Sequence, residues 1–392
     1  MNKRRVLYTA FDLFPSPKGA SIHILHFLRA LVNNKYDVQL ITPGDGVLPA
    51  EDNFEGARIT RIASAAGNNF LDRAIQFGEA IMDHVAVETP YQVVHYRSIW
   101  GGLQLALAKN QYGYKTLFEV NGLPSIELKY HYPGIQGTVL LDKIREQELA
   151  TLQGSDAIIC PSRVTAAYLI SLGVPEKRIT VIPNGVSQQD FPQATLLPTE
   201  GHIPVILYIG TLADWQGLDI LIKTMPLILA QQPIHLRIVG RGRSRQRKTL
   251  AKQISKAGLA EFVSLEEAVP HHEVAGLIAQ ADICVSPLGY NDRNVLQGCC
   301  PIKIIEYMAV GRPLVASNLP VVRELVREGQ DGLLFTPNDP EDLACKILKI
   351  LQDRNLAERL AENAANRARE QLTWHIAQKK LLKVYQHLEK PA

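Results

Sequence analysis

Short apolar runs alternate along the chain with stretches of helical periodicity, a pattern typical of parallel α/β sheets. In the first half, the pattern predicts β-strands over residues 6–11, 37–42, 93–96, 116–120, 157–161 and 179–182. In the second half, it predicts strands over residues 205–209, 235–239, 262–265, 283–286, 314–316 and 332–335. We therefore expect an α/β protein with two doubly wound, Rossmann-like sheets.

The two halves of the chain echo each other, as two similar domains would. The segment S-D-A-I-I-C-P-S from Ser155 resembles A-D-I-C-V-S-P from Ala281, and 392 residues are too many for one ordinary core. We predict a first domain over residues 1–190, a proline-rich polar linker over 191–204 and a second domain over 205–371. The final segment 372–392, with a helix over 374–388, is expected to return to the first domain. The two domains would face each other across a cleft, with ligands beyond the carboxyl ends of the strands.

Residues 301–317, P-I-K-I-I-E-Y-M-A-V-G-R-P-L-V-A-S, predict a helix, a glycine turn and a buried strand. Pro301 suits the first helical position, where its missing N–H costs nothing. The N–H groups of Ile302, Lys303 and Ile304 would then be free to bind a phosphate. Lys303 and Glu306 are three residues apart and so share a helix face. A cation for an anion and a carboxylate for hydroxyls are what a sugar nucleotide requires.

Two loops on the first-half side contain glycine where a strand gives way to the next element. Gly19 lies between the first strand and a helical run over 22–32, where the backbone could approach a ligand closely. An ordinary strand-to-helix turn explains Gly19 equally well. Asn184 belongs to an Asn-Gly turn just before the linker, which is either a hinge or a ligand contact.

In the second half, Gly210, Thr211 and Gln216 follow the strand over 205–209 and precede a helix. Thr211 and Gln216 would be neutral donors to a diphosphate. The segment H-L-R-I-V-G-R-G from His235 carries only a fragment of the dinucleotide fingerprint. Arg241 is the member of the following basic run that lies nearest the strand end, and we expect it at a phosphate.

Charge and composition exclude several classes of protein. A net charge of +3, with 46% hydrophobic and 21% charged residues, fits a globular enzyme and argues against nucleic acid as a partner. No apolar run is long enough to span a membrane. Asp12 interrupts the apolar N-terminal run, which therefore reads as a strand rather than a signal peptide.

Five cysteines without metal-ligand spacing fit a reducing cytoplasm. The adjacent pair Cys299 and Cys300 is explained either by packing or by a redox or metal role. Asp-x-Asp, the usual anchor for the metal of a sugar diphosphate, is absent from the sequence. Lys3, Arg4, Arg5 and the amphipathic run over 22–36 fit either a peripheral contact with an anionic membrane on its cytoplasmic side or a helix packed on the sheet.

Together these motifs resemble glycosyltransferase family 4, a retaining, metal-independent group with the GT-B fold. The resemblance covers nearly the whole chain and rests on the order and spacing of K-G-A-S-I-H, F-E-V-N-G-L-P-S-I-E-L, S-D-A-I-I-C-P-S, V-I-P-N-G-V, Y-I-G-T-L-A-D-W-Q-G-L, L-R-I-V-G-R-G and the segment 301–317. It implies transfer of a sugar from a nucleoside-diphosphate donor to a hydroxyl of a glycan, lipid-linked or small-molecule acceptor. It implies no cofactor and no metal.

The resemblance also assigns roles to residues. The donor is expected mainly in the second domain and the acceptor in the first. Glu306 matches the second glutamate of the family's Glu-x7-Glu motif and would bind the ribose hydroxyls. Gly19 matches the glycine whose backbone approaches the donor, and the backbone at 302–304 would hold the diphosphate. The leaving phosphate itself would take the acceptor proton, so no enzymic nucleophile is required.

Three departures from the family pattern mark this chain. Gly298 stands where the first glutamate of Glu-x7-Glu is expected, and Thr211 and Gln216 stand where a basic pair is usual. Asn121 with its following glycine replaces the His-Gly of many relatives. We interpret these changes as a subtype in which Lys303 compensates, with Lys303, Glu306 and Asn121 as the catalytic set. A non-catalytic subunit that binds sugar nucleotides and a GT-B sugar-nucleotide epimerase remain the alternatives.

Overall fold

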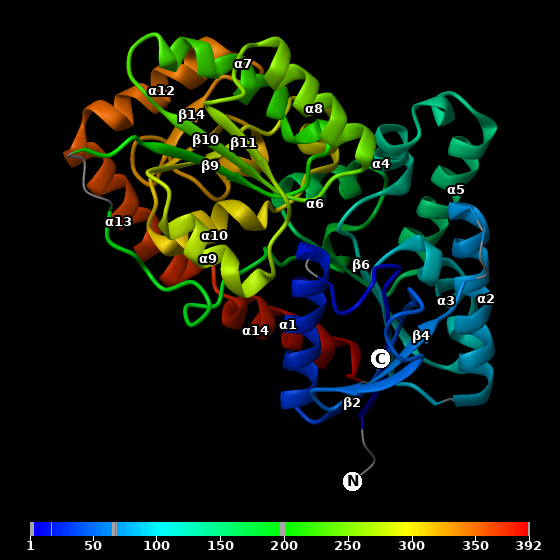
Figure 1. The fold of residues 1–392 in the computed structure, drawn as a ribbon. Coiled ribbons are helices and arrows are strands. Elements are labelled where there is room, and N and C mark those ends of the chain that lie inside the picture. Colours follow the sequence, from blue (N-terminus) through cyan, green and yellow to red (C-terminus); the bar gives the residue numbers. More distant parts are fainter. Residues whose placement is uncertain are drawn as a thin grey trace. The chain divides into compact units, whose positions relative to one another are not determined.

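A computed structural model of the chain describes residues 4–16, 18–64, 67, 69–88, 90–196 and 201–390. The chain divides into two compact units, one made of residues 1–183 with 377–392 and the other of residues 184–376 (Figure 1). Each unit is built on its own β-sheet.

The first unit contains an eight-stranded sheet within the described residues, in the order β3-β4-β2-β1-β5-β6-β7-β8. Its strands are β1 (Arg4–Thr9), β2 (Tyr36–Pro43), β3 (Glu51–Phe54), β4 (Ala57–Ile62), β5 (Val93–Tyr96), β6 (Lys115–Glu119), β7 (Ala157–Cys160) and β8 (Ile179–Val181). Its helices are α1 (Gly19–Asn33), α2 (Phe70–Glu88), α3 (Ile99–Tyr112), α4 (Pro124–His131), η1 (Pro133–Ile135), α5 (Val139–Gly154), α6 (Arg163–Ser171) and η2 (Glu176–Arg178). The strand order reverses direction between β1 and β5, which is where such sheets bind ligands.

The predicted strands of this half are all present, but the β3–β4 hairpin was not predicted. β3 pairs with β4 antiparallel, whereas β4 joins β2 in parallel. The sequence of β4, A-R-I-T-R-I, buries Ala57 and Ile59 while Arg58 is exposed. This alternation is the signal of a half-buried strand, and a search for continuous apolar runs misses it.

The second unit contains a six-stranded sheet, all parallel within the described residues, in the order β11-β10-β9-β12-β13-β14. Its strands are β9 (Val205–Ile209), β10 (His235–Val239), β11 (Val263–Glu266), β12 (Ile283–Ser286), β13 (Leu314–Ser317) and β14 (Leu333–Phe335). Its helices are η3 (Asp214–Gln216), α7 (Leu218–Leu229), α8 (Ser244–Lys256), α9 (His271–Ala279), the π-helical turn η4 (Arg293–Gln297), α10 (Ile302–Val310), α11 (Pro320–Arg323), α12 (Pro340–Gln352) and α13 (Arg354–Gln371). Here the order reverses between β9 and β12.

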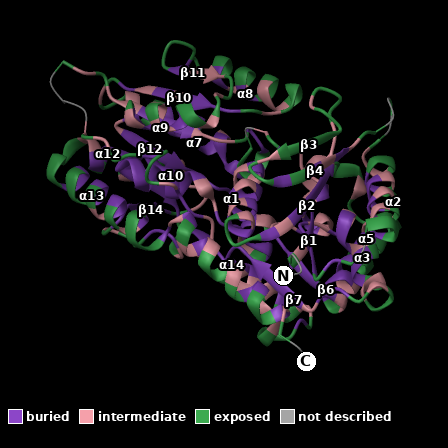
Figure 2. Ribbon diagram, turned by 90° about the horizontal axis from the view of Figure 1, so that it is seen from below, coloured by how far each residue is buried: buried purple, intermediate pink, exposed green. Residues whose placement is uncertain are grey.

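Helices cover both faces of each sheet, so the central strands are buried while the outer sides of the helices are exposed (Figure 2). Leu7, Val94 and Ile158 lie in the core of the first unit, and Ile206 and Ile283 lie in that of the second. Burial on both faces explains why parallel strands read as continuous apolar runs.

The boundary between the units differs from the one predicted at residue 190. The division lies after Pro183, because the chain that follows packs within the second unit. The ring of Phe191 lies 5.3 Å from that of His271, and the N–H of Ala194 donates to the carbonyl of Val310 at 2.9 Å. The start of the predicted linker is therefore part of the second unit, and its residues 197–200 lie outside the described ranges.

Helix α14 (Trp374–Leu388) begins in the second unit and continues into the first. In the first unit, the side-chain amide of Gln378 donates to the carbonyl of His26 at 2.8 Å. The hydroxyl of Tyr385 lies 3.0 Å from Nδ1 of His95, and both side chains are fully buried. The last helix thus completes the core of the unit that begins the chain.

The amphipathic run over 22–36 packs inward. Ile24, Phe27 and Leu31 of α1 are buried in the first unit, which leaves no broad apolar side on this helix for a bilayer. Arg4 forms an ion pair with Glu389, and Lys3 lies outside the described residues. Over the described ranges, no helix has both the length and the apolar character that a membrane crossing needs.

Candidate functional site

The start of α10 supplies fewer free backbone donors than predicted. Pro301 precedes the helix as its N-cap, and Ile302 is the first helical residue. The N–H of Ile304 donates to the carbonyl of Pro301 at 3.1 Å, in the tight turn that often opens a helix. Ile304 is therefore not free, which corrects the prediction. Within the described residues, the N–H groups of Ile302 and Lys303 have no acceptor.

The side chain of Lys303 crosses from α10 to the end of β9. Its ammonium donates to the hydroxyl of Tyr208 at 2.9 Å and to Oε1 of Gln216 at 2.5 Å, and only 8% of the residue is exposed. A Cβ at Gly210 would lie 2.7 Å from Nζ, so the glycine makes room for the lysine. Lys303 thus brings a cation to the loop from which the family's usual basic pair is missing.

Burial lowers the pKa of the Lys303 ammonium to about 7. Arg293 lowers it further, while Cys299 and Glu306 oppose the shift, and the two hydrogen-bonding partners at Tyr208 and Gln216 are neutral. A phosphate placed nearby would favour the charged form and raise this pKa again. The lysine therefore sits where an anion would stabilise it.

Glu306 lies on the same helix and is also buried, with 6% of the residue exposed. Its Oε1 is 3.1 Å from Nε2 of His271, at the start of α9. The other carboxylate oxygen has no partner in the described part of the chain and can accept hydrogen bonds. Sequence reasoning missed His271, because nothing in the chain links two residues so far apart in sequence.

The loops after β9 and β10 touch through glycines. A Cβ at Gly240 would collide with the carbonyl oxygen of Gly210, and one at Gly242 would lie 2.7 Å from the Cβ of Leu212. The G-R-G segment therefore serves close packing of two loops rather than a dinucleotide fingerprint. Arg241 lies between these glycines, its carbonyl accepting from the N–H of Leu212 at 2.9 Å. Its side chain is exposed and has no ion pair with any described residue.

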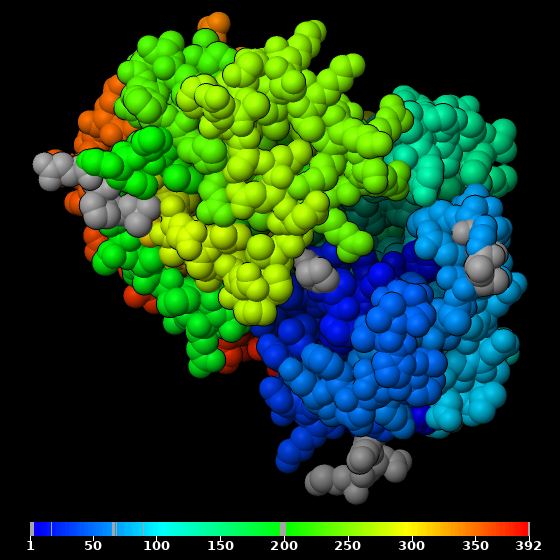
Figure 3. Space-filling model, in the orientation of Figure 1, coloured from blue at the N-terminus to red at the C-terminus, as the bar shows by residue number. Residues whose placement is uncertain are grey.

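The basic run that continues into α8 lies at the surface, where that helix is yellow-green in Figure 3. Arg247 donates to the carbonyl oxygens of Leu265 and Glu266, so it ties α8 to β11.

Thr211, Gln216 and Asn184 use part of their hydrogen-bonding capacity within the protein. Nε2 of Gln216 donates to Oγ1 of the exposed Thr211 at 3.3 Å. Nδ2 of Asn184 donates to the carbonyl of Cys300 at 2.7 Å, which ties the chain entering the second unit to the residue before Pro301. Burial raises the pKa of the Cys300 thiol to about 12, which favours the packing interpretation of the cysteine pair.

The first unit holds a second polar cluster, of which the prediction named only Asn121. Five side chains surround the carboxylate of Glu119 at the end of β6: Tyr8, His23, His95, Arg97 and Asn121. Tyr8 donates to Oε2 at 2.7 Å, and Nε2 of His23 lies 3.0 Å from Oε1. Arg97 also reaches Asp12, 3.3 Å away, beyond the end of β1. We call Glu119 and the five side chains that surround it the Glu119 cluster.

Some members of the Glu119 cluster carry a signal in the sequence, although their convergence does not. His95 and Arg97 lie at the end of β5, and Glu119 is a carboxylate inside the apolar run T-L-F-E-V.

Gly19, the other predicted residue of the first unit, is exposed as the first residue of α1. Across the described ranges, no three His, Cys, Asp or Glu side chains converge in a way that could hold a metal ion.

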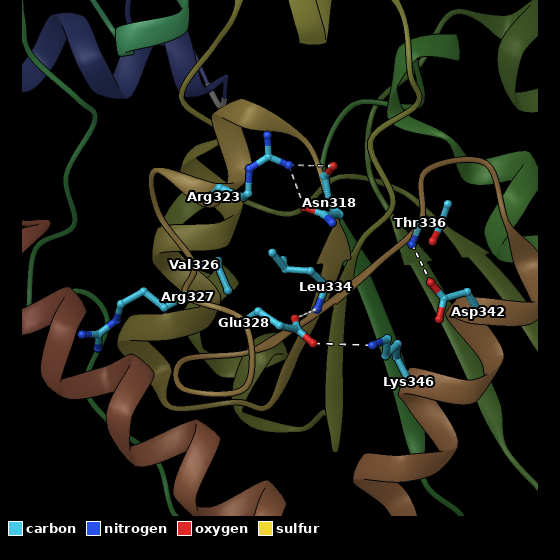
Figure 4. A pocket seen from close by; sticks show the side chains of 9 residues that line it. All are labelled: Asn318, Arg323, Val326, Arg327, Glu328, Leu334, Thr336, Asp342 and Lys346. Carbon is cyan, nitrogen blue, oxygen red and sulfur yellow. Dashed lines mark hydrogen bonds and ion pairs between the residues drawn. The ribbon is translucent and has the colours of Figure 1, made fainter.

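A pocket of about 500 Å³ begins where β13 and β14 end (Figure 4). Its polar side chains are largely paired with one another: Lys346 lies 3.5 Å from Glu328, and Arg323 donates to Asn318 at 2.8 Å. The lining residues are Asn318, Arg323, Val326, Arg327, Glu328, Leu334, Thr336, Asp342 and Lys346. None of the predicted site residues is among them, so this pocket is separate from the candidate site.

Two family models match the chain in succession and together cover most of it. The model described as Glycosyltransferase Family 4 matches residues 17–190, and the one described as Glycosyl transferases group 1 matches residues 203–353. A relative, the D-inositol 3-phosphate glycosyltransferase of Thermobispora bispora, is 24% identical over 94% of this chain and 89% of its own length.

Solved structures show the same fold. Sucrose-phosphate synthase from Thermosynechococcus elongatus has a TM-score of 0.83 and 21% identity, over 98% of this chain and 99% of its own. HepE of Anabaena, solved in complex with UDP and glucose, has a TM-score of 0.75 and 16% identity, over 98% of this chain and 100% of its own. The fold is therefore α/β of the GT-B class, as predicted. With both family models matched in order, the chain belongs to the group 1 glycosyltransferases of glycosyltransferase family 4.

Proposed function

We propose that this glycosyltransferase moves a sugar from a nucleoside-diphosphate-sugar to an acceptor hydroxyl, with retained configuration and without a metal ion. The observation that carries the proposal is the buried ammonium of Lys303, which reaches the loop after β9 and has no carboxylate in hydrogen-bond contact among the described residues. A buried cation in this state is costly for the protein, and an anionic ligand would offset the cost.

The second unit would hold the donor. The N–H groups of Ile302 and Lys303, the Lys303 ammonium and the exposed Arg241 would bind the diphosphate, and Glu306 would accept hydrogen bonds from the ribose. As the glycosidic bond breaks, negative charge grows on the leaving phosphate, and a fixed cation there lowers the barrier. The phosphate then takes the proton of the acceptor hydroxyl on the same face. Among solved neighbours, HepE was crystallised with UDP, which supports UDP-sugars as the first donors to test.

A panel of sugar nucleotides tests the donor class. UDP-glucose, UDP-galactose, UDP-N-acetylglucosamine, GDP-mannose and ADP-glucose are added separately, and the melting temperature is measured. A donor at a hundredfold excess over its Kd stabilises the folded protein by about 2.7 kcal/mol. Stabilisation by none of these donors would contradict the proposal.

Two variants then locate the site. Lys303→Ala is expected to weaken binding of the stabilising donor about tenfold to a hundredfold, since a hydrogen bond to a charged group contributes about 1.5–3 kcal/mol. Glu306→Ala should weaken binding about tenfold. Lys349→Ala, at an exposed lysine of α12, is the control. Equal affinities in all three variants and the wild type would place the donor elsewhere.

Turnover separates the enzyme from a binding subunit. Release of the free nucleoside diphosphate, with an anomeric product of unchanged configuration, is expected at full rate in EDTA. Binding without any release, even to water, would favour the alternative of a non-catalytic subunit. Loss of activity in EDTA that Mg²⁺ restores would refute metal independence.

A further inference from the structure

Helix α8 of the second unit carries a row of cations along its exposed side (Figure 2). Four exposed residues follow one another at intervals of three, four and four positions, so they share one side of the helix: Arg245, Lys248, Lys252 and Lys256. Leu250 and Ile254, on the opposite side, are buried. We call the four cations the basic stripe. At 1.5 Å of rise per residue, the stripe is roughly 16 Å long.

The basic stripe has no acidic partner. Residues 241–256 contain seven Lys or Arg and no Asp or Glu, whereas the whole chain has a net charge of +3, so the remaining residues together are net negative. Within the described part of the chain, none of the four cations forms an ion pair. Arg247, on another side of α8, pairs with the nearby Glu267 at 3.2 Å. Unpaired positive charge is therefore concentrated on this one helix face.

This arrangement works against the stability of the helix. Lys248, Lys252 and Lys256 are four residues apart in turn, the spacing at which like charges repel each other. Arg245 lies in the first turn, at the positive end of the helix dipole, and that turn contains no acidic residue. A face that had only to be soluble would mix both signs of charge. A negatively charged partner offsets both costs, which solvent alone does not.

The rest of the exposed face indicates the kind of partner. Between the cations it presents the small side chains of Thr249, Ala251 and Ser255. It has no aromatic side chain on which the bases of a nucleic acid could stack, and no large apolar side chain to enter a hydrocarbon layer. What remains is a straight row of positive charges. Its complement is a plane of negative charges, which a bilayer containing anionic lipids presents.

We propose that the basic stripe of α8 docks the second unit on the surface of a bilayer that contains anionic lipids. The peripheral contact expected from the sequence was placed on residues 3–5 and on the run over 22–36, but α1 packs inward, and α8 supplies the unpaired cationic face that α1 lacks. The inference goes beyond the proposed function and does not depend on it. Docking would concentrate the protein beside any acceptor anchored in the same bilayer.

The experiment measures sedimentation of the full-length protein with vesicles. One set of vesicles is phosphatidylcholine alone, and the other contains phosphatidylserine as about a third of its lipid. We expect binding to the anionic vesicles only, and weaker binding as salt is added, because the contact is electrostatic. Lys252→Gln should weaken binding about fivefold, the effect of one cation at an anionic surface. Lys349→Gln, at an exposed lysine of α12, is the control and should bind as the wild type does.

A double variant separates binding from folding. Arg245→Glu with Lys248→Glu places carboxylates at the amino-terminal end of α8, where the helix dipole favours them. Its melting temperature should therefore equal or exceed that of the wild type, while its binding to anionic vesicles falls to the level seen with neutral ones. Lys349→Glu with Lys379→Glu, at exposed lysines outside α8, changes the net charge equally and should bind far more tightly than the α8 variant.

Four results would overturn the inference. These are a wild type that does not bind anionic vesicles at low salt, an α8 variant that binds them as the wild type does, equal losses in the two double variants, and tighter binding of the wild type to heparin or duplex DNA than to vesicles at equal negative charge. Binding of sugar nucleotides in solution is measured on the same variants and should not change, since Arg241 is retained. A donor that fails to bind the wild type refutes the proposed function and leaves vesicle docking standing.

Discussion

Replacing Lys303 by methionine should make the unliganded protein more stable and remove a specific part of its pH dependence. Methionine keeps the apolar stem of the side chain and removes the buried ammonium. Without a bound anion, the buried ammonium lowers the stability of the folded protein. The residue that serves ligand binding therefore reduces stability at this position.

The magnitude follows from the pKa of about 7 in the folded protein against 10.5 for the free side chain. At acidic pH, where both states bind the proton, the difference corresponds to about 5 kcal/mol of destabilisation. Between pH 7 and pH 9 the unfolded chain stays protonated while the folded protein releases the proton. Stability of the wild type therefore rises with pH over this window, by about 2 kcal/mol from Lys303 alone.

The methionine variant lacks this rise. It also leaves Oε1 of Gln216 without its lysine donor, which costs about 1–3 kcal/mol but does not change with pH. The quantity to compare is the unfolding free energy of the variant minus that of the wild type. Its value at pH 7 minus its value at pH 9 isolates the contribution of Lys303 from that of every other titrating group. It should be about 2 kcal/mol in favour of the variant at pH 7.

The assay is urea unfolding followed by tryptophan fluorescence at both pH values. Lys349→Met, at an exposed lysine on α12, serves as the matched control and should keep the wild-type pH dependence. Parallel curves for the wild type and Lys303→Met across this window would show that the lysine is charged in the folded protein, and the reasoning would fail.

Further predictions concern binding and packing. UDP affinity should fall by up to about tenfold per pH unit from pH 7 to 9, because a nearby phosphate raises the pKa of Lys303 and binding takes up a proton; calorimetry in buffers of different ionisation enthalpy measures that uptake, and Lys303→Met should abolish it. Gly240→Ala should cost about 1–3 kcal/mol or more in unfolding free energy, because its Cβ meets a backbone oxygen of the loop after β9; Gly276→Ala, on α9 with open space around it, should cost nothing. Tyr385→Phe should cost about 1–3 kcal/mol, since it leaves Nδ1 of His95 buried without its hydrogen-bond partner, and a melting temperature equal to that of the wild type would contradict this contact.

The sequence predicted the sheets well because buried parallel strands are continuous apolar runs, and β9, β10 and β12 have the predicted bounds. It failed at β4, whose alternating pattern follows a different rule, and at the unit boundary, which packing of Phe191 decides. It also counted Ile304 as a free donor, because the local turn that uses this N–H is not visible in residue types.

Sequence motifs predicted some residues of the candidate site but not the residues that they contact. Lys303 and Glu306 were named from their spacing and Asn121 from the family resemblance, but the partners that define their chemistry come from distant segments. Tyr208 and His271 were not foreseen, and the convergence of side chains on Glu119 requires knowing that β1, β5 and β6 lie side by side. Such contacts are products of topology, which a single sequence does not display.

Helix α14 gives the chain an order of events during synthesis. The sheet of the first unit is translated first, yet Leu381 and Tyr385, which complete its core, leave the ribosome only after the whole second unit. The second unit, residues 184–376, is an uninterrupted segment and is finished earlier. We therefore expect the amino-terminal unit to remain incomplete until α14 has been made, and a fragment ending at residue 183 to be deficient in folding even though it contains the whole eight-stranded sheet.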